Sequence, residues 1–255
     1  MRITTLADRP DLDGATWALP NTWPEFMRQD PVADRLFGQI PQRWPQLQLI
    51  GLEPAAVKDE QSDGTEQVVA LLRAVAFAWD GDLASLPDRG WDGVLQRAVD
   101  DDTAGRTPTA VSLIEATVHP ERQGAGLSRE LIVAARARCR AAGFRDLFGP
   151  VRPSAKWHEP RTPITEYAER VRSDGLPADP WLRVHARLGG RSVRVCPVSM
   201  TIPGTLDEWR AWTGLPFDRS GRVEVPHALC PVHVDVEAGH AVYVEPNVWV
   251  HHDLR

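Results

Sequence analysis

Two patterns of apolar residues occur in turn along this chain, and they predict strands and helices that follow one another. Strands are expected where short runs are mostly apolar, and helices where apolar residues recur every three or four positions. The expected strands are residues 2–6, 46–52, 68–79, 109–118, 145–151, 191–202 and 240–251. The expected helices are residues 24–40, 91–101, 127–142 and 206–213, with shorter ones opening at Thr162-Pro163 and at Asp179-Pro180. Because strands and helices alternate in the middle of the chain, the pattern predicts an α/β protein with a parallel or mixed sheet.

Local signals refine several of these boundaries. Asp30 stands where an N-cap is needed before an apolar periodic run. Thr205 and Glu208 have the spacing of a capping box, which predicts a helix that starts at residue 206. Pro197 indicates a bulge or an edge in its strand. The polar run 58–67 predicts a turn that joins its neighbouring strands as a hairpin.

Charge and composition exclude several classes of protein. The net charge of −6 argues against a nucleic-acid partner, because phosphate neutralisation needs a basic face. The apolar stretch 68–79 contains Arg73 and is shorter than the roughly 20 residues that span a membrane. The charged N-terminus lacks the apolar core of a signal peptide. The 3 cysteines are too scattered for a disulfide framework or a zinc site. We therefore expect a cytoplasmic protein without a metal or a membrane partner.

Residues 109–142 carry the clearest chemical signal. A strand ends at Val118, a glycine-containing turn follows, and a long helix begins near Leu127. The unpaired N–H groups of a helix start and the helix dipole form an anion site. Six arginines and one glutamate occur between Arg122 and Arg145, so this acidic protein is locally basic. The segment predicts a ligand that carries phosphate.

The glycines match neither common nucleotide loop. The run Gln123–Ser128 lies in mid-chain and lacks the third glycine of a dinucleotide fingerprint, and neither lysine is near enough for a P-loop. The run instead resembles the pyrophosphate loop of the GNAT acyltransferase superfamily, [QR]-x-x-G-x-[GA], placed between that family's fourth strand and third helix. Gln123 and Gly126 match the motif, and Ser128 stands where Gly or Ala is usual.

The resemblance implies a fold and a cofactor. The fold would be a single GNAT domain over residues 1–255. Its mixed central sheet would have splayed fourth and fifth strands and flanking helices, with the core at about 1–202 and a C-terminal elaboration over 203–255. Acetyl-CoA or another acyl-CoA would lie between the splayed strands. The residues implied to bind it are Thr117 and Val118 along the pantetheine, Gln123, Gly124, Ala125, Gly126, Leu127 and Ser128 at the pyrophosphate, and Ser154 beyond the fifth strand.

The resemblance also implies direct transfer of the acyl group to a small-molecule amine, and it allows a homodimer. Such a reaction needs a base for the amine and an acid for the departing thiolate. Glu115 is the one carboxylate in the strand 109–118 and is a candidate base, or alternatively an ion-pair partner of an arginine. His185 stands four residues before Gly189, where many members of the family carry a tyrosine that protonates the leaving thiolate. Alternatively, His185 is a core histidine whose hydrogen bonds are made within the protein. Tyr167 is a third candidate, lining the acceptor site or replacing the acid.

Two other functions remain open on the sequence. Ser128 in the motif and the unassigned base are compatible with a protein that binds or senses acyl-CoA without turnover. The run 179–185 also resembles GNAT-like loading domains of polyketide synthases, which implies acylation of a carrier-protein thiol. Trp17, Trp23, Phe26 and Met27 would border the acceptor pocket or belong to the core.

Overall fold

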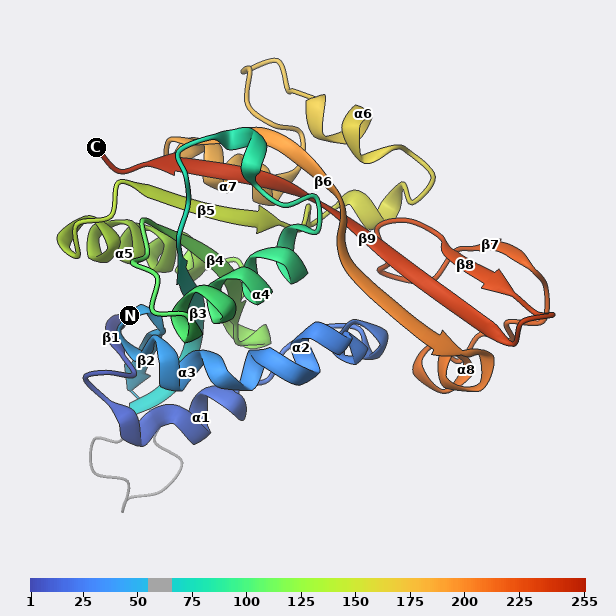
Figure 1. Ribbon diagram of the computed structural model, residues 1–255, viewed down its shortest axis with the longest axis horizontal. Coiled ribbons are helices and arrows are strands. Elements are labelled where there is room, and N and C mark those ends of the chain that lie inside the picture. The colour runs from blue at the N-terminus through green and yellow to red at the C-terminus, as the bar shows by residue number, and fades with distance from the viewer. Residues whose placement is uncertain (55–65) are drawn as a thin grey trace.

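A mixed sheet organises the molecule (Figure 1). The computed structural model describes residues 1–54 and 66–255. Within these residues the sheet has nine strands in the order β1-β2-β3-β4-β5-β9-β8-β7, with β6 paired to β9. β4 and β5 are parallel, and the other described pairs are antiparallel. The strands are β1 (Arg2–Thr5), β2 (Leu49–Pro54), β3 (Glu66–Phe77), β4 (Ala110–Val118), β5 (Asp146–Val151), β6 (Gly190–Thr205), β7 (Gly221–Val223), β8 (Val232–Asp235) and β9 (His240–Asp253).

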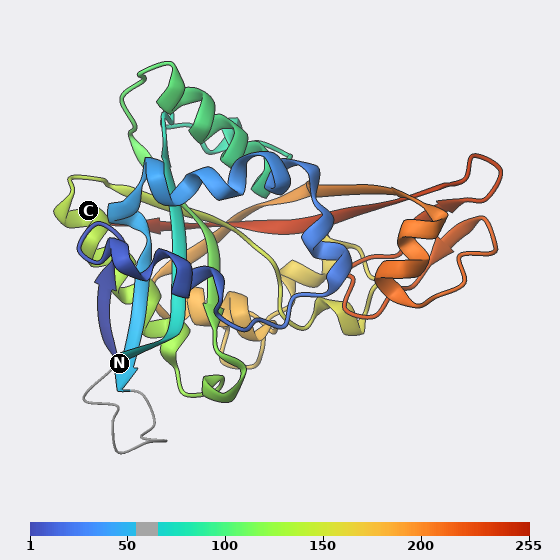
Figure 2. The same cartoon turned by 90° about the horizontal axis from the view of Figure 1, so that it is seen from below.

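Helices cover both faces of this sheet. They are α1 (Asp13–Trp17), α2 (Pro31–Leu36), α3 (Ile40–Arg43), α4 (Gly90–Thr103), α5 (Leu127–Ala141), α6 (Ile164–Glu169), α7 (Pro180–Arg187) and α8 (Leu206–Thr213). Figure 2 shows α2 and α4 on one side of the sheet and α5 and α7 on the other. No helix in the described part of the chain is long and apolar enough to cross a membrane.

β4 and β5 diverge soon after they meet. Their register pairs are Val111 with Leu147 and Ser112 with Phe148, at one end of both strands. Beyond these pairs β4 continues to Val118, so the predicted splay is present. β4 also carries a bulge, because Arg73 faces Glu115 while Ala74 faces Leu113. A bulge beside a splay redirects the side chains that follow it.

The last strand occupies a central place. β9 pairs with β5 on one side and with β6 on the other. The stretch 203–255, expected as an elaboration, therefore contributes its final strand to the main sheet. The physical reason is burial: Trp249 and Val250 lie in the core, at 0% and 1% exposure. The far ends of β6 and β9, with α8, β7 and β8, extend as a lobe (Figure 1).

The local signals are confirmed where they are described. The carboxylate of Asp30 accepts hydrogen bonds from the N–H groups of Val32 and Ala33 at 2.9 and 2.8 Å. The capping box of Thr205 and Glu208 is formed. The pairing of β6 with β9 shifts register after Cys196, next to Pro197. Most of the expected turn 58–67 lies outside the described residues.

The prediction of one continuous helix over residues 24–40 is wrong. Residues 24–40 form a 3-10 turn over Glu25–Gln29, the short helix α2 and a second 3-10 turn over Phe37–Gln39. Pro31 interrupts the run because it donates no N–H group and restricts the residue before it. The strands β7 and β8 were not predicted, since three and four residues show too little alternation.

Candidate active site

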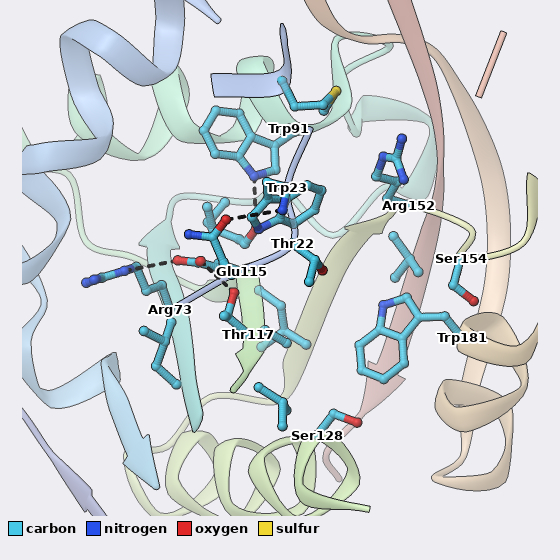
Figure 3. A pocket seen from close by; sticks show the side chains of 18 of the residues that line it. Thr22, Trp23, Arg73, Trp91, Glu115, Thr117, Ser128, Arg152, Ser154 and Trp181 are labelled. Carbon is cyan, nitrogen blue, oxygen red and sulfur yellow. Dashed lines mark hydrogen bonds and ion pairs between the residues drawn. The ribbon is translucent and has the colours of Figure 1, made fainter. Parts of the chain in front are cut away.

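A cavity of about 920 Å³ opens where β4 and β5 separate. This volume is in the range of small-molecule and cofactor sites. Figure 3 shows side chains that face it from β4, such as Glu115, and from the segment that follows β5, such as Arg152. Ten of the predicted catalytic and cofactor-binding residues line the cavity: Glu115, Thr117, Val118, Gln123, Gly124, Gly126, Leu127, Ser128, Ser154 and His185. Ala125 and Tyr167 are not among the described residues that line it.

One part of the cavity, here called the cofactor end after the role that the sequence resemblance implies, is lined by residues of the stretch 117–128. Gly124 and Gly126 have φ angles of +79° and +81°, in the left-handed region where a side chain is strained. Gly126 is the N-cap of α5, and no side chain caps the helix there. The first N–H groups of α5 therefore remain available to an anion. Leu127 is buried and anchors the turn, while Ser128 is half-buried on the cavity wall.

Glu115 is held in place by two neighbours. Its Oε2 accepts a hydrogen bond from Arg73 Nε at 3.1 Å, and its Oε1 accepts one from Thr117 Oγ1 at 2.7 Å. Arg73 is buried, with a side chain only 3% exposed. Its guanidinium stacks over the ring of Trp17 at 4.1 Å. Glu115 is thus an arginine's ion-pair partner and also lines the cavity.

Burial lowers the pKa of Arg73, and Glu115 opposes that shift. The carboxylate and the guanidinium stabilise each other, because an unpaired charge at this depth would be costly. The nearby bulge is fixed by Trp91, whose indole N–H donates to the carbonyl of Ile114 at 2.9 Å. The ion pair and this hydrogen bond fix the position of Glu115 on the cavity wall.

His185 lies in a buried histidine pair. Its Nδ1 is 2.9 Å from Nε2 of His252, and Trp181 packs edge-on against its ring. Burial, aided by the neighbouring His252, lowers the pKa of His185 to about 3. The imidazole is therefore neutral near pH 7. Its Nε2 has no hydrogen-bond partner among the described residues, and the side chain lines the cavity.

Tyr167 and Ser154 both contact Asp179, the N-cap residue of α7. The Tyr167 hydroxyl donates to Asp179 Oδ2 at 3.0 Å, and the backbone N–H of Ser154 lies 3.3 Å from Oδ1. Asp179 also accepts from the first N–H groups of α7. Burial and the adjacent carboxylate raise the pKa of Tyr167. Tyr167 thus holds the start of α7, whereas Ser154 lies on the cavity wall.

The other part of the cavity, here called the far end, is formed by Trp23, Arg152, His227, Glu245 and Asn247. Arg152 follows β5 and donates from Nε to Glu245 Oε2 at 2.9 Å. Burial alone would lower the pKa of Arg152, but the interactions with Glu245 and Tyr243 outweigh this effect and raise the pKa.

Sequence reasoning found Trp23 and missed the polar residues of the far end. Glu245 and Asn247 are almost fully buried in β9, at 0% and 1% exposure. Charged and amide residues are rarely buried without partners. The Glu-Pro-Asn run inside an otherwise apolar strand is the signal that could have revealed them.

Comparisons with known proteins agree with this geometry. No family model matches the chain. The arginine N-acetyltransferase avaD of Aspergillus versicolor is 33% identical over 279 residues, which cover 99% of this chain and 94% of that protein. The loading GNATL domain of CurA from Lyngbya majuscula has a similar structure, with a TM-score of 0.59, 17% identity and coverage of 99% of this chain and 96% of that one. The GphF GNAT-like decarboxylase in complex with isobutyryl-CoA gives a TM-score of 0.57, 18% identity and complete coverage of both chains.

Proposed function

This chain belongs to the GNAT superfamily and is an acyl-CoA-dependent N-acyltransferase, and on that premise we propose that its acceptor is arginine. The 33% identity to an arginine N-acetyltransferase over almost the whole of both chains carries this proposal. The cavity supports it, since one continuous space offers a phosphate-binding helix start and a separate polar end for a second substrate.

The acyl-CoA would lie along the splay of β4 and β5. Its pantetheine would run beside Thr117 and Val118, and its pyrophosphate would rest on residues 123–128. The left-handed glycines fit this role, because they expose N–H groups without side chains in the way. Ser154 would contact the cofactor from beyond β5.

Glu115 would accept a proton from the acceptor's ammonium, directly or through a water. The resulting amine attacks the thioester carbonyl carbon, the carbon–sulfur bond breaks, and the departing thiolate takes up a proton. That proton comes from the attacking nitrogen, which carries one more than the amide product needs. We propose that His185, neutral near pH 7, donates a hydrogen bond from its unpartnered Nε2 to the sulfur as the thiolate departs. The products are the N-acyl acceptor and CoA, with one proton released overall. Tyr167 would act on this chemistry only through Asp179 and the position of α7.

The test is turnover with the full chain, acetyl-CoA and L-arginine. We expect arginine-dependent release of the CoA thiol and the mass of acetylarginine. Acylation of a carrier protein's phosphopantetheine arm, without reaction on arginine, would instead establish a loading enzyme. Stabilisation by acetyl-CoA without CoA release, over a broad panel of amines and thiols, would contradict both and leave a binding protein.

A further inference from the structure

Arg152 has hydrogen-bonding capacity that its protein partners do not use. Its Nε donates to Glu245 and its Nη2 donates to the carbonyl of His227 at 2.6 Å. Among the described residues these are its two hydrogen bonds of good geometry, with the Tyr243 hydroxyl as a further neighbour of the guanidinium, and Nη1 takes part in neither. The side chain is 18% exposed and lines the cavity. An arginine presents five N–H donors in a planar fork, so the edge formed by Nη1 and Nη2 can still receive a ligand.

The groups behind Arg152 are occupied by one another. Glu245 accepts from Arg152, from the Tyr243 hydroxyl at 2.8 Å and from Asn247 Nδ2 at 3.0 Å. The amide oxygen of Asn247 accepts from Ser199 Oγ at 2.6 Å. This network fixes the guanidinium of Arg152. The donors that remain for a ligand in the cavity are the N–H groups of Arg152. The far end is therefore built to bind an acceptor of hydrogen bonds, and its positive donor favours an anion.

That anion is distinct from the phosphates of the cofactor. Figure 3 shows Ser128, at the start of α5, and Arg152 on different sides of the cavity. The guanidinium also lies 5.8 Å from the ring centroid of Trp23, a residue of the N-terminal segment rather than of the cofactor loop. Two anion sites in one cavity fit two substrates, each with its own negative group.

We infer that Arg152 binds the carboxylate of the acceptor amino acid, in a fork held in position by Glu245; the inference rests on the proposed function. A guanidinium and a carboxylate form two parallel hydrogen bonds in this geometry. Arg152 is then a specificity residue, since it selects acceptors that carry a carboxylate. Glu245 is a positioning residue, because it acts through Arg152.

The experiment compares three acceptors with the wild-type chain and acetyl-CoA. L-Arginine carries the carboxylate, argininamide replaces it with a neutral amide, and agmatine lacks it. We expect kcat/KM for L-arginine to exceed the other two by about 10- to 100-fold, the range for one hydrogen bond to a charged group. In Arg152→Met the three acceptors should become nearly equal, through a higher KM for L-arginine. Arg152→Lys should retain part of the preference, because it keeps the charge and loses the fork.

Arg152→Met leaves Glu245 buried and unpaired, so this variant could fail to fold. The double variant Arg152→Met/Glu245→Gln removes both charges and should also lose the preference while it still binds acetyl-CoA in a thermal shift. Arg161→Met is the matched control, because it removes an exposed ion pair with Glu224 away from the cavity lining. It should keep the wild-type ratio of the three acceptors.

Two outcomes would overturn the inference. In one, wild-type protein acetylates agmatine and argininamide as efficiently as L-arginine. In the other, the folded Arg152 variants lose activity on all three acceptors by the same factor. If acetyl-CoA binds and none of the three is acetylated, the proposed acceptor itself is wrong and the inference falls with it.

Discussion

The two ends of the cavity are built in opposite ways. The cofactor end comes from one stretch, residues 117–128, and offers backbone N–H groups at the start of α5. The far end collects Trp23, Arg152, His227, Glu245 and Asn247 from separate segments, and it offers a buried network of side chains. Backbone donors suit a ligand that many related enzymes share, while a side-chain network can be changed one residue at a time.

The difference indicates where specificity resides. Replacing a side chain at the cofactor end leaves the N–H groups in place, provided that the glycine conformations survive. Replacing Arg152 or Glu245 changes the charge that a second substrate meets. We therefore expect variants of the cofactor end to affect every acceptor equally, and variants of the far end to discriminate between acceptors.

The largest expected effect lies between the two ends, at Glu115. Glu115→Gln should lower kcat by about 10²–10⁴-fold, because the amide cannot take the acceptor's proton. KM for acetyl-CoA should change little, since the cofactor loop is untouched. Steady-state kinetics with L-arginine measure both quantities.

Stability must be separated from catalysis here, because Glu115→Gln weakens the buried ion pair with Arg73. Loss of one partner of a buried pair costs about 3–5 kcal/mol. The double variant Arg73→Met/Glu115→Met should recover much of that free energy of unfolding and none of the activity. If Glu115→Gln keeps wild-type kcat, Glu115 has only the ion-pair role.

A smaller effect is expected at the cofactor end. Gly126→Val should raise KM for acetyl-CoA by about 10²-fold, a loss of roughly 2.7 kcal/mol. The reason is the φ angle of +81°, which a β-branched residue does not adopt without strain. The N–H groups that follow would then turn away from the phosphates.

Gly105→Val is the matched control for this prediction. Gly105 has a φ angle of +66° and open space around it, in the turn after α4. Its substitution should cost stability and leave KM for acetyl-CoA unchanged. Equal effects of the two variants on KM would show that strain, and not the lost anion site, explains the result.

The same contrast explains how much of the site was predictable from the sequence. Gln123 to Ser128 could be located because a helix start and its glycines are local features. The splay of β4 and β5 followed from the family resemblance carried by those residues. Glu245 and Asn247 stand out in the sequence as polar residues in an apolar strand, but their partnership with Arg152 could not be predicted, because it depends on β9 lying between β5 and β6. Sequence periodicity identifies a strand but does not say which strand it joins.

His185 shows a related limit. Its place on α7 was predicted, but its surroundings depend on His252, a residue of β9. We expect His185→Gln to lower kcat by about tenfold to 10²-fold without changing KM for either substrate. With the pKa of His185 at about 3, its ionisation should not appear in the rate profile between about pH 5 and pH 7. A wild-type kcat that changes with a pKa near 6.5, and a His185→Gln kcat that does not, would contradict the burial of His185 against His252.

The same pKa affects stability. His185 binds a proton less readily when folded than when unfolded, so the unfolded chain takes up more protons below about pH 6.5. The stabilisation is present above that pH and is lost as the pH falls toward 3. His185→Gln should therefore flatten the loss of melting temperature in acid. Unfolding monitored from about pH 7 to about pH 4 measures this slope.

The smallest expected effect concerns the wall formed by α2 and α4. Asp92 on α4 is buried next to Asp30, the N-cap of α2, and residues of α2 line the cavity. Burial, with repulsion from Asp30, raises the pKa of Asp92 to about 8. The folded chain therefore holds a proton that the unfolded chain has lost, and this stabilisation is present at low pH and lost as the pH rises through 8.

Asp92→Asn should flatten that loss, raising the melting temperature near pH 9 by roughly 2–4 °C for each 1 kcal/mol regained. Because residues 123–128 belong to neither α2 nor α4, KM for acetyl-CoA should stay constant over the same pH range in both proteins. A wild-type melting temperature that falls no more between about pH 5 and pH 8 than that of Asp92→Asn would show that Asp92 does not hold this proton in the folded chain.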